Sequence, residues 1–159
     1  MTVLSTTHLK PLGEYDFSKG FMYSIHQLHT LVQKHLEQAL TRQKSLSFSQ
    51  FMVLVGFVCG SETQVSQASI AECAHLTEAT VSRHISTLVG LGYLLRKEDA
   101  DNRRKYKITI TKKGLTVFKQ AESLIDKELL TIFKDINEKE RKSIMKNFDN
   151  VLTQLLTKK

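Results

Sequence analysis

Residues 66–110 constrain the fold of this 159-residue chain more than any other stretch, because they join two capped helices to a charged hairpin. Ser66 is placed to cap a short helix over residues 67–74. After a tight turn, Thr77 is placed to cap a second helix over residues 78–91. Two such helices joined by a short turn pack closely against each other.

The helix predicted over residues 78–91 has one apolar and one polar face. Its apolar residues recur at the i, i+4, i+7, i+8 spacing of an inward face: Val81, Ile85, Leu88 and Val89. The opposite face carries small hydrogen-bonding side chains and one guanidinium: Thr80, Ser82, Arg83, His84, Ser86 and Thr87. We expect Gly92 to end this helix.

A β-hairpin is predicted directly after Gly92, with strands over residues 93–97 and 105–110. In the second strand Tyr106, Ile108 and Ile110 alternate with polar residues, which is typical of a half-buried strand. The connecting residues 98–104 are highly charged and end in two arginines.

Two helices across a tight turn, followed by a hairpin with a basic tip, form the order of a winged helix-turn-helix. Small polar side chains let a helix approach base edges in the major groove, and a cationic hairpin can lie on phosphates or in the minor groove. Helices alone would also suit an ordinary αα-hairpin, but the arginine-tipped hairpin favours DNA binding. The predicted DNA-contacting residues are Thr80, Ser82, Arg83, His84, Ser86, Thr87, Arg103, Arg104, Lys105 and Lys107.

Each kind of side chain suggests a different contact. Arg83 is a candidate for bidentate pairing with guanine, and the hydroxyls are candidates for phosphates or thymine methyl groups. One wing arginine is expected in the minor groove, and the other is expected to pair with Asp99 or Asp101 inside the loop. Lys105 and Lys107 are phosphate candidates, and we interpret Arg96 as structural.

The run LTEATVSRHISTLVGLGYLLRKEDADNRR followed by KITITKKG resembles the MarR family of bacterial transcription regulators. In that family such a run is a recognition helix, a glycine exit, a wing and a T-x-x-G entry to a long helix. The resemblance implies a triangular dimer, with Arg103 in the minor groove and Arg104 in the internal pair. Thr87 stands where the family often has a long basic residue.

The distribution of charge agrees with a polyanionic partner. The chain carries a net charge of +7. Residues 77–119 hold ten Lys or Arg against four Asp or Glu, so this stretch supplies +6 and the other residues only +1. No apolar run approaches the roughly 18–20 residues of a membrane span, and the two cysteines form no disulfide framework. We therefore expect a soluble cytoplasmic protein.

The flanking segments predict long amphipathic helices. One apolar stripe runs from Phe17 to about residue 40, and a capping box at Ser47–Gln50 begins a buried helix at Phe48. Thr111 is placed to cap a further long helix, and a second capping box at 137–140 begins the last one. Roughly twenty large apolar side chains on three terminal helices exceed what a monomer leaves exposed, which favours a homodimer.

The predicted fold is therefore mainly α with a small β-hairpin wing, a winged helix-turn-helix flanked by long N- and C-terminal dimerisation helices. We expect an arm and dimerisation helix over 1–45, a DNA-binding lobe over 46–110 and dimerisation helices over 111–159. The predicted function is a homodimeric regulator of a pseudo-palindromic operator, a repressor relieved by a small molecule. The predicted pocket walls, which equally suit a plain core, are Phe21, Ile25, Phe48, Met52 and Phe118.

Several alternatives remain open at the level of sequence. A winged helix can serve as a protein-interaction module that never touches DNA. His26, His29 and His35 raise a metal-responsive regulator, and Cys59 and Cys73 raise a redox-responsive one. We expect no metal or cofactor, because no C-x-x-C or H-x-x-x-H run occurs, and we expect both cysteines in the core. No nucleophile–base arrangement or phosphate-binding loop predicts an enzyme.

Overall fold

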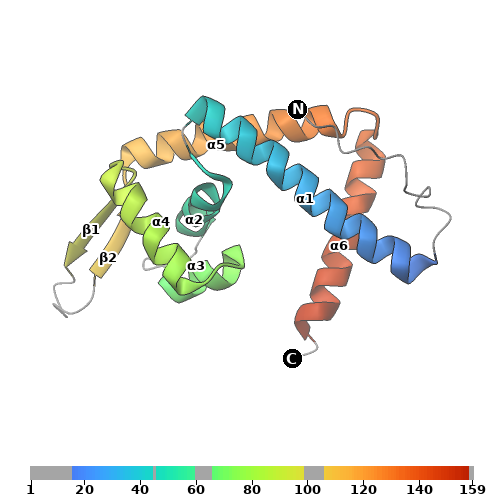
Figure 1. The fold of residues 1–159 in the computed structure, drawn as a ribbon, viewed down its shortest axis with the longest axis horizontal. Coiled ribbons are helices and arrows are strands. Elements are labelled where there is room, and N and C mark those ends of the chain that lie inside the picture. Colours follow the sequence, from blue (N-terminus) through green and yellow to red (C-terminus); the bar gives the residue numbers. More distant parts are fainter. Residues whose placement is uncertain (1–15, 45, 60–65, 99–105, 158–159) are drawn as a thin grey trace.

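The computed structural model describes residues 16–44, 46–59, 66–98 and 106–157. These residues form a helical molecule in which a lobe with a β-hairpin lies at one end and helix α6 lies at the other (Figure 1). The elements in chain order are α1 (Phe17–Lys44), α2 (Phe48–Cys59), α3 (Gln67–Ala74), α4 (Glu78–Gly90), β1 (Leu94–Glu98), β2 (Tyr106–Ile110), α5 (Lys112–Ile132) and α6 (Glu138–Thr157). The mainly helical fold with a hairpin wing is confirmed.

Reciprocal capping bonds fix the starts of α2 and α6. The backbone N–H of Ser47 donates to Oε1 of Gln50 at 2.9 Å, and the N–H of Gln50 donates to Oγ of Ser47 at 3.1 Å. Asn137 and Glu140 make the same exchange at 3.0 Å in each direction. Each box satisfies two backbone donors that a helix start would otherwise leave unpaired, so both predicted starts are confirmed.

Helices α3 and α4 form the helix-turn-helix. Oγ of Ser66 accepts from the N–H of Ser69, and Oγ1 of Thr77 accepts from the N–H of Thr80, as their positions predict. Between the helices His75 adopts a left-handed conformation with φ 51° and ψ 42°. That conformation lets its N–H reach the carbonyls of α3, so the turn closes with the backbone paired.

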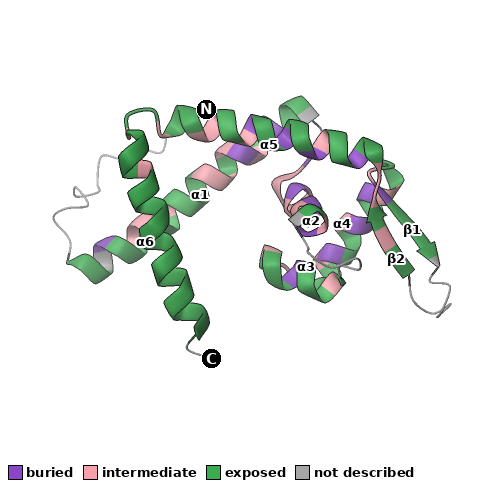
Figure 2. Ribbon diagram, turned by 180° about the vertical axis from the view of Figure 1, so that it is seen from behind, coloured by how far each residue is buried: buried purple, intermediate pink, exposed green. Residues whose placement is uncertain are grey.

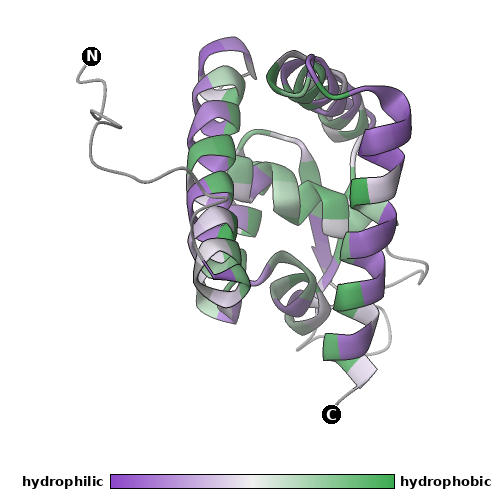
Figure 3. Ribbon diagram, turned by 90° about the vertical axis from the view of Figure 1, so that its right-hand side faces the viewer, coloured by the Kyte–Doolittle hydropathy of each residue, from purple (hydrophilic) through white to green (hydrophobic). Residues whose placement is uncertain are grey.

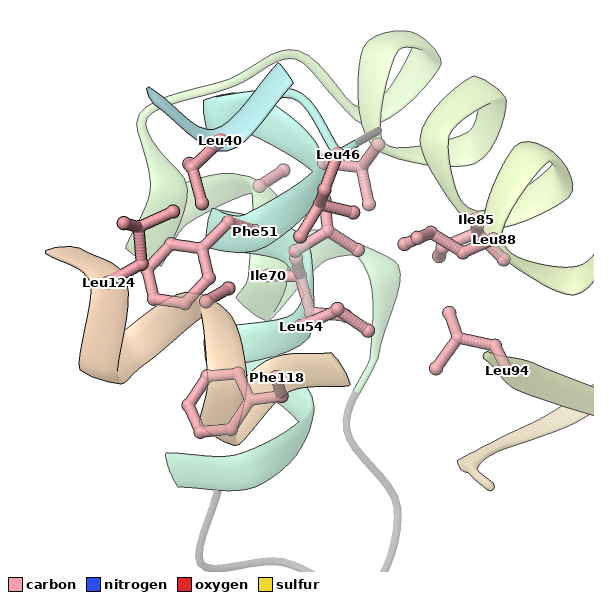
Figure 4. Packing of buried hydrophobic residues seen from close by; sticks show 14 of the residues in the cluster. Leu40, Leu46, Phe51, Leu54, Ile70, Ile85, Leu88, Leu94, Phe118 and Leu124 are labelled. Atoms are coloured by element: carbon pink, nitrogen blue, oxygen red, sulfur yellow. The ribbon is translucent and has the colours of Figure 1, made fainter. Parts of the chain in front are cut away.

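Helix α2 is the centre of the hydrophobic core. It packs against α1, α3, α4, α5 and β2, which explains why it is apolar nearly all round. Phe51 of α2 stacks on Phe118 of α5 with ring centroids 5.5 Å apart and an interplanar angle of 6° (Figure 4). Other fully buried side chains are Leu40, Leu46, Val53, Leu54, Ile70, Val81, Ile85, Leu88 and Leu94. The core thus ties both helices of the helix-turn-helix to α5.

The start of α5 is hydrogen-bonded to the residues that follow α4. Oγ1 of Thr111 donates to the carbonyl of Gly92 at 2.8 Å and accepts from the N–H of Gly114 at 2.9 Å. Gly92 has φ +73°, which only glycine adopts without strain. A Cβ on Gly114 would lie 2.1 Å from the carbonyl oxygen of Tyr93. Gly92 is therefore required by its backbone conformation, and Gly114 by the close approach of the two segments.

The terminal helices leave much of their apolar surface uncovered. Helix α1 packs on α5, where Nε2 of His35 lies 2.6 Å from Oε2 of Glu128. Toward its N-terminus the α1 stripe becomes exposed, and Phe17 is 84% accessible. No residue of α6 is buried (Figure 2). Hydrophobic residues nevertheless recur along both α1 and α6 (Figure 3). The chain's own C-terminal helices therefore bury only part of the α1 stripe.

Several details differ from the sequence predictions, among them the end of α4 at Gly90 rather than at residue 91. Strand β1 begins at Leu94 rather than at Tyr93, because the N–H of Tyr93 still bonds to the carbonyl of Leu88 in the helix exit. Helix α1 continues to Lys44. Cys73 is exposed, so its predicted place in the core is wrong. Helix α3 buries Ile70 and Ala71, and Cys73 falls outside that face. The side chain of Cys59 lies outside the described residues.

None of the described helices is long and apolar enough to span a bilayer.

Candidate nucleic-acid interface

The outer face of α4 presents most of the residues predicted to read DNA. Ser82, Arg83, Ser86 and Thr87 are exposed, whereas Val81, Ile85 and Leu88 are buried on the opposite side. Because the buried face is anchored in the core, the exposed face is held in a fixed orientation. The structure thus brings the predicted polar residues of α4 together on one face, with His84 as the exception discussed below.

Two hydroxyl groups on this face, those of Ser86 and Thr87, already donate their protons within the helix. Oγ of Ser86 donates to the carbonyl of Ser82 at 3.0 Å, and Oγ1 of Thr87 donates to the carbonyl of Arg83 at 3.1 Å. A hydroxyl that donates to the backbone keeps its lone pairs free to accept. In this state the two hydroxyls suit amino groups on base edges better than phosphate oxygens.

Arg83 remains available for an outside partner. Its guanidinium is exposed, and its Nη2 donates at 3.4 Å to Oγ1 of Thr80, a long bond to a neutral group. Thr80 is half-buried and also bonds to the capping residue Thr77. A planar cation with several free donors matches the two acceptors of guanine in the major groove.

His84 lies on the side of α4 that faces α1. It is half-buried and lines a cleft of about 570 Å³ with residues of α1 and of the start of α2. Desolvation by burial, with a smaller contribution from the Arg83 charge, lowers the pKa of His84 below its ordinary value. The remaining lining residues are His29, Thr30, Gln33, Lys34, Glu37, Ser47 and Ser49.

The described part of the wing is a regular antiparallel hairpin. Leu94 pairs with Ile110 and Arg96 with Ile108, so one side chain row faces the lobe and the other faces outward. The guanidinium of Arg96 lies 3.8 Å from the centroid of the Tyr106 ring. This cation–π contact supports the structural role predicted for Arg96. Lys107 is exposed on the outward row. Arg103, Arg104 and Lys105, with Asp99 and Asp101, lie outside the described residues.

The predicted pocket walls occupy two separate places. Phe21 and Ile25 line an apolar cleft of about 570 Å³ between α1 and α6, together with Phe148. Phe118 is buried in the core, and Phe48 and Met52 pack against that core. The cleft at Phe21 is not lined by these three residues.

The structure bears differently on the metal and redox alternatives, because the exposure of Cys73 removes the core placement that had counted against a redox response. Among the described residues, no three His, Cys, Asp or Glu side chains come together as a metal site. His35 instead contacts Glu128 across α1 and α5. Cys73 is exposed on α3 as a free thiol.

One residue that contacts the end of α4 was not predicted from the sequence. Nζ of Lys113 in α5 donates at 2.8 Å to the carbonyl of Leu91, the C-terminal cap of α4, and lies 5.1 Å from the Tyr93 ring centroid. A lysine in the first turn of a helix gives no local signal of a contact 22 residues away. The excess of basic residues after α4 is the only hint in the sequence.

Comparisons with known proteins agree with this geometry. A family model described as a winged helix DNA-binding domain matches residues 51–130. No curated protein matches the sequence. Among solved structures, the transcriptional regulator BldR from Sulfolobus solfataricus is 20% identical with a TM-score of 0.74, covering 89% of this chain and 98% of its own.

Two further similar structures carry the same arrangement. A MarR/EmrR family transcriptional regulator from Acinetobacter sp. ADP1 is 16% identical with a TM-score of 0.72, covering 90% of this chain and 99% of its own. MepR from S. aureus, solved as a complex with DNA, is 22% identical with a TM-score of 0.64, covering 89% of this chain and 98% of its own. These similarities confirm the MarR-like fold that the wing motif implied, and the chain belongs to the winged helix DNA-binding domain family.

Proposed function

We propose that this protein is a transcription regulator that binds a pseudo-palindromic operator as a homodimer in the cytoplasm and is released by a small-molecule effector. The observation that carries the proposal is the outer face of α4, where an exposed arginine stands among small hydroxyl side chains on a helix anchored in the core. Each subunit inserts α4 into a major groove and lays its wing across the adjacent minor groove. The complex of MepR with DNA is consistent with this use of the fold.

The uncovered apolar surface supports the homodimer. Phe17, Phe21 and Leu28 on α1 and two apolar rows on α6 are exposed in the single chain. A continuous apolar surface of this extent exceeds what soluble monomers tolerate, and a two-fold partner presents the same surface in return. Residues 1–45 and 111–159 then serve dimerisation, and residues 46–110 form the DNA-binding lobe. Two recognition helices about one helical turn apart, ~34–36 Å, read two half-sites.

The cleft beside His84 supports the effector response. It touches α1, which belongs to the dimer, and α4, which enters the DNA. A ligand that prefers one spacing of α1 and α4 changes the population of dimers whose two α4 helices are in register with the two half-sites. DNA affinity falls by the ratio of the ligand's affinities for the two states. Repression relieved by the ligand is the simplest regulatory outcome.

The decisive experiment is a selection of genomic fragments by the purified protein, followed by affinity measurements on the recovered duplexes. We expect the bound fragments to share an inverted repeat. Arg83→Ala should relax sequence preference at one base pair in each half-site, at roughly 1–3 kcal/mol per half-site, and should therefore weaken binding of the dimer to the whole repeat by about 30- to 25,000-fold. Arg103→Ala should weaken binding through the minor groove.

A matched control separates base reading from general charge loss. Lys127→Ala removes one cation from an exposed position in the C-terminal half of α5 and should leave the preference at every base pair unchanged. Bound fragments without a shared repeat, or equal binding by Arg83→Ala and wild type, would instead favour the protein-interaction module.

A further inference from the structure

The outward row of the wing places two lysines directly opposite each other. Lys97 of β1 pairs with Lys107 of β2 in the antiparallel register, next to the tip of the described hairpin. Both side chains are exposed. Directly paired residues on one face of a hairpin have Cβ atoms only about 4.5–5.5 Å apart. The two ammonium groups therefore share one small region of surface.

This pairing works against the hairpin in the free protein. Like charges directly opposite each other destabilise a strand pair. Among the described residues, no carboxylate forms an ion pair with either lysine. On the opposite row of the same strands, the guanidinium of Arg96 is stacked on the Tyr106 ring, which compensates its charge. Among the residues that the structure describes, no such contact compensates the charges of the lysine pair.

A polyanion bound between Lys97 and Lys107 removes the repulsion between their ammonium groups, because its negative charges neutralise both. We propose that Lys97 and Lys107 form a phosphate clamp that binds two neighbouring phosphates of the DNA backbone beside the minor groove entered by the wing. This assignment rests on the proposed DNA binding and adds Lys97 to the residues that carry it. Phosphate contacts of this kind fix the register of a protein on DNA without reading sequence. The clamp thus sets where the wing tip sits along the groove.

Protection of the strand edges is the competing explanation for the same residues. Both strands of a two-stranded sheet are edges, and lysines on edge strands discourage pairing with other chains. That role predicts aggregation after lysine removal. A phosphate clamp predicts a change in the salt dependence of DNA affinity.

The test measures the affinity of Lys97→Gln, Lys107→Gln and the double variant for a fluorescent duplex long enough for two half-sites. Fluorescence anisotropy is recorded between about 50 and 200 mM salt. For each lysine substituted, the slope of log affinity against log salt should become shallower by about 1.8, because the homodimer loses one phosphate contact, worth about 0.9, in each of its two subunits. Lys97→Arg and Lys107→Arg keep the charge and should keep the slope.

Lys127→Gln provides the matched control, since it removes the same charge from α5 and should leave the slope unchanged. An unchanged slope in the double variant, with Arg83→Ala still losing sequence-specific binding, would overturn the clamp and leave the proposed function standing. Absence of sequence-specific binding by the wild type would overturn the proposed function itself. Aggregation of the double variant with an unchanged slope in its soluble fraction would assign the lysines to edge protection.

Discussion

Lys113 at the start of α5 donates a 2.8 Å hydrogen bond from its Nζ to the carbonyl of Leu91, the residue that caps the C-terminus of α4. A cation at this end of a helix meets unpaired carbonyls and the negative end of the helix dipole. Thr111 bonds to the next two carbonyls, those of Gly92 and Tyr93. The first turn of α5 therefore binds the end of α4 through three consecutive carbonyl groups, those of residues 91–93.

Replacing Lys113 should weaken the contact between the first turn of α5 and the end of α4 without disturbing the core. We expect Lys113→Met to lower the free energy of unfolding by about 0.5–1 kcal/mol, because an exposed charged donor at a helix C-terminus is lost. Urea denaturation measures the change. Lys112→Met removes the neighbouring exposed charge, which makes no such contact among the described residues, and should shift stability by less. Equal losses of stability in the two variants would show that the hydrogen bond from Lys113 to the carbonyl of Leu91 does not stabilise the protein.

Gly114 tolerates no side chain, because its Cβ would lie 2.1 Å from the carbonyl oxygen of Tyr93. We expect Gly114→Ala to destabilise the protein by about 3 kcal/mol or more, since the α4 exit and α5 must move apart. Thermal unfolding followed by circular dichroism would show a large drop in Tm.

Gly90 offers the matched control for that substitution. It is the last residue of α4, and a Cβ there meets no atom within 4 Å. Gly90→Ala should be neutral or should stabilise by up to about 1 kcal/mol, because alanine loses less backbone entropy in a helix. Similar Tm values for the two alanine variants would contradict the close approach at Gly114.

Local rules predicted the helix starts to the residue. Ser66, Thr77, Thr111 and Asn137 all cap the helices that follow them, because a cap bond spans only three residues and is visible in the sequence. The glycine exit and the hairpin are similarly local. Fold class follows from the order of such elements.

Features set by distant segments could not be predicted. His84 lies three residues after a buried valine and one before a buried isoleucine, yet its half-buried state depends on α1, far away in the chain. The contact of His35 with Glu128 spans 93 residues. Cys73 was misplaced because an eight-residue helix gives only two turns from which to assign a buried face. Periodicity identifies an apolar face without identifying its partner.

Protonation of His84 should weaken the folded state. Burial and the Arg83 charge hold the pKa of His84 below its ordinary value of 6.5, so the unfolded chain binds a proton more readily than the folded one. The stabilising contribution of neutral His84 is therefore complete above that ordinary value and is lost as pH falls through the folded-state pKa. His84→Gln should flatten this part of the dependence of stability on pH.

The measurement is a series of urea midpoints from about pH 7.5 to pH 5, the range in which histidines titrate. Ser86→Ala lies on the same helix, keeps every titratable group and should keep the wild-type slope. Parallel slopes for wild type and His84→Gln would show that burial of this imidazole does not control the acid side of the stability profile.

The last prediction concerns the exposed apolar rows of α6. Leu152 is 56% exposed in the single chain and lies on the row with Met145 and Leu156. If this row meets a second copy, Leu152→Asp buries a carboxylate without a partner, which costs several kcal/mol per carboxylate. Because a two-fold interface contains the position twice, the penalty counts twice. Sedimentation velocity should show a dimer for the wild type and a monomer for Leu152→Asp.

Asn150→Asp introduces the same charge on the same helix, but its position lies on the opposite, polar face. This variant should remain a dimer and should bind an inverted repeat as tightly as the wild type. Leu152→Asp should keep the helical circular dichroism of the core, since α6 contributes no buried residue to it. Its DNA affinity should fall steeply, because a single recognition helix then binds one half-site without the contribution of the second. A dimer that survives Leu152→Asp would move the subunit interface away from this face of α6.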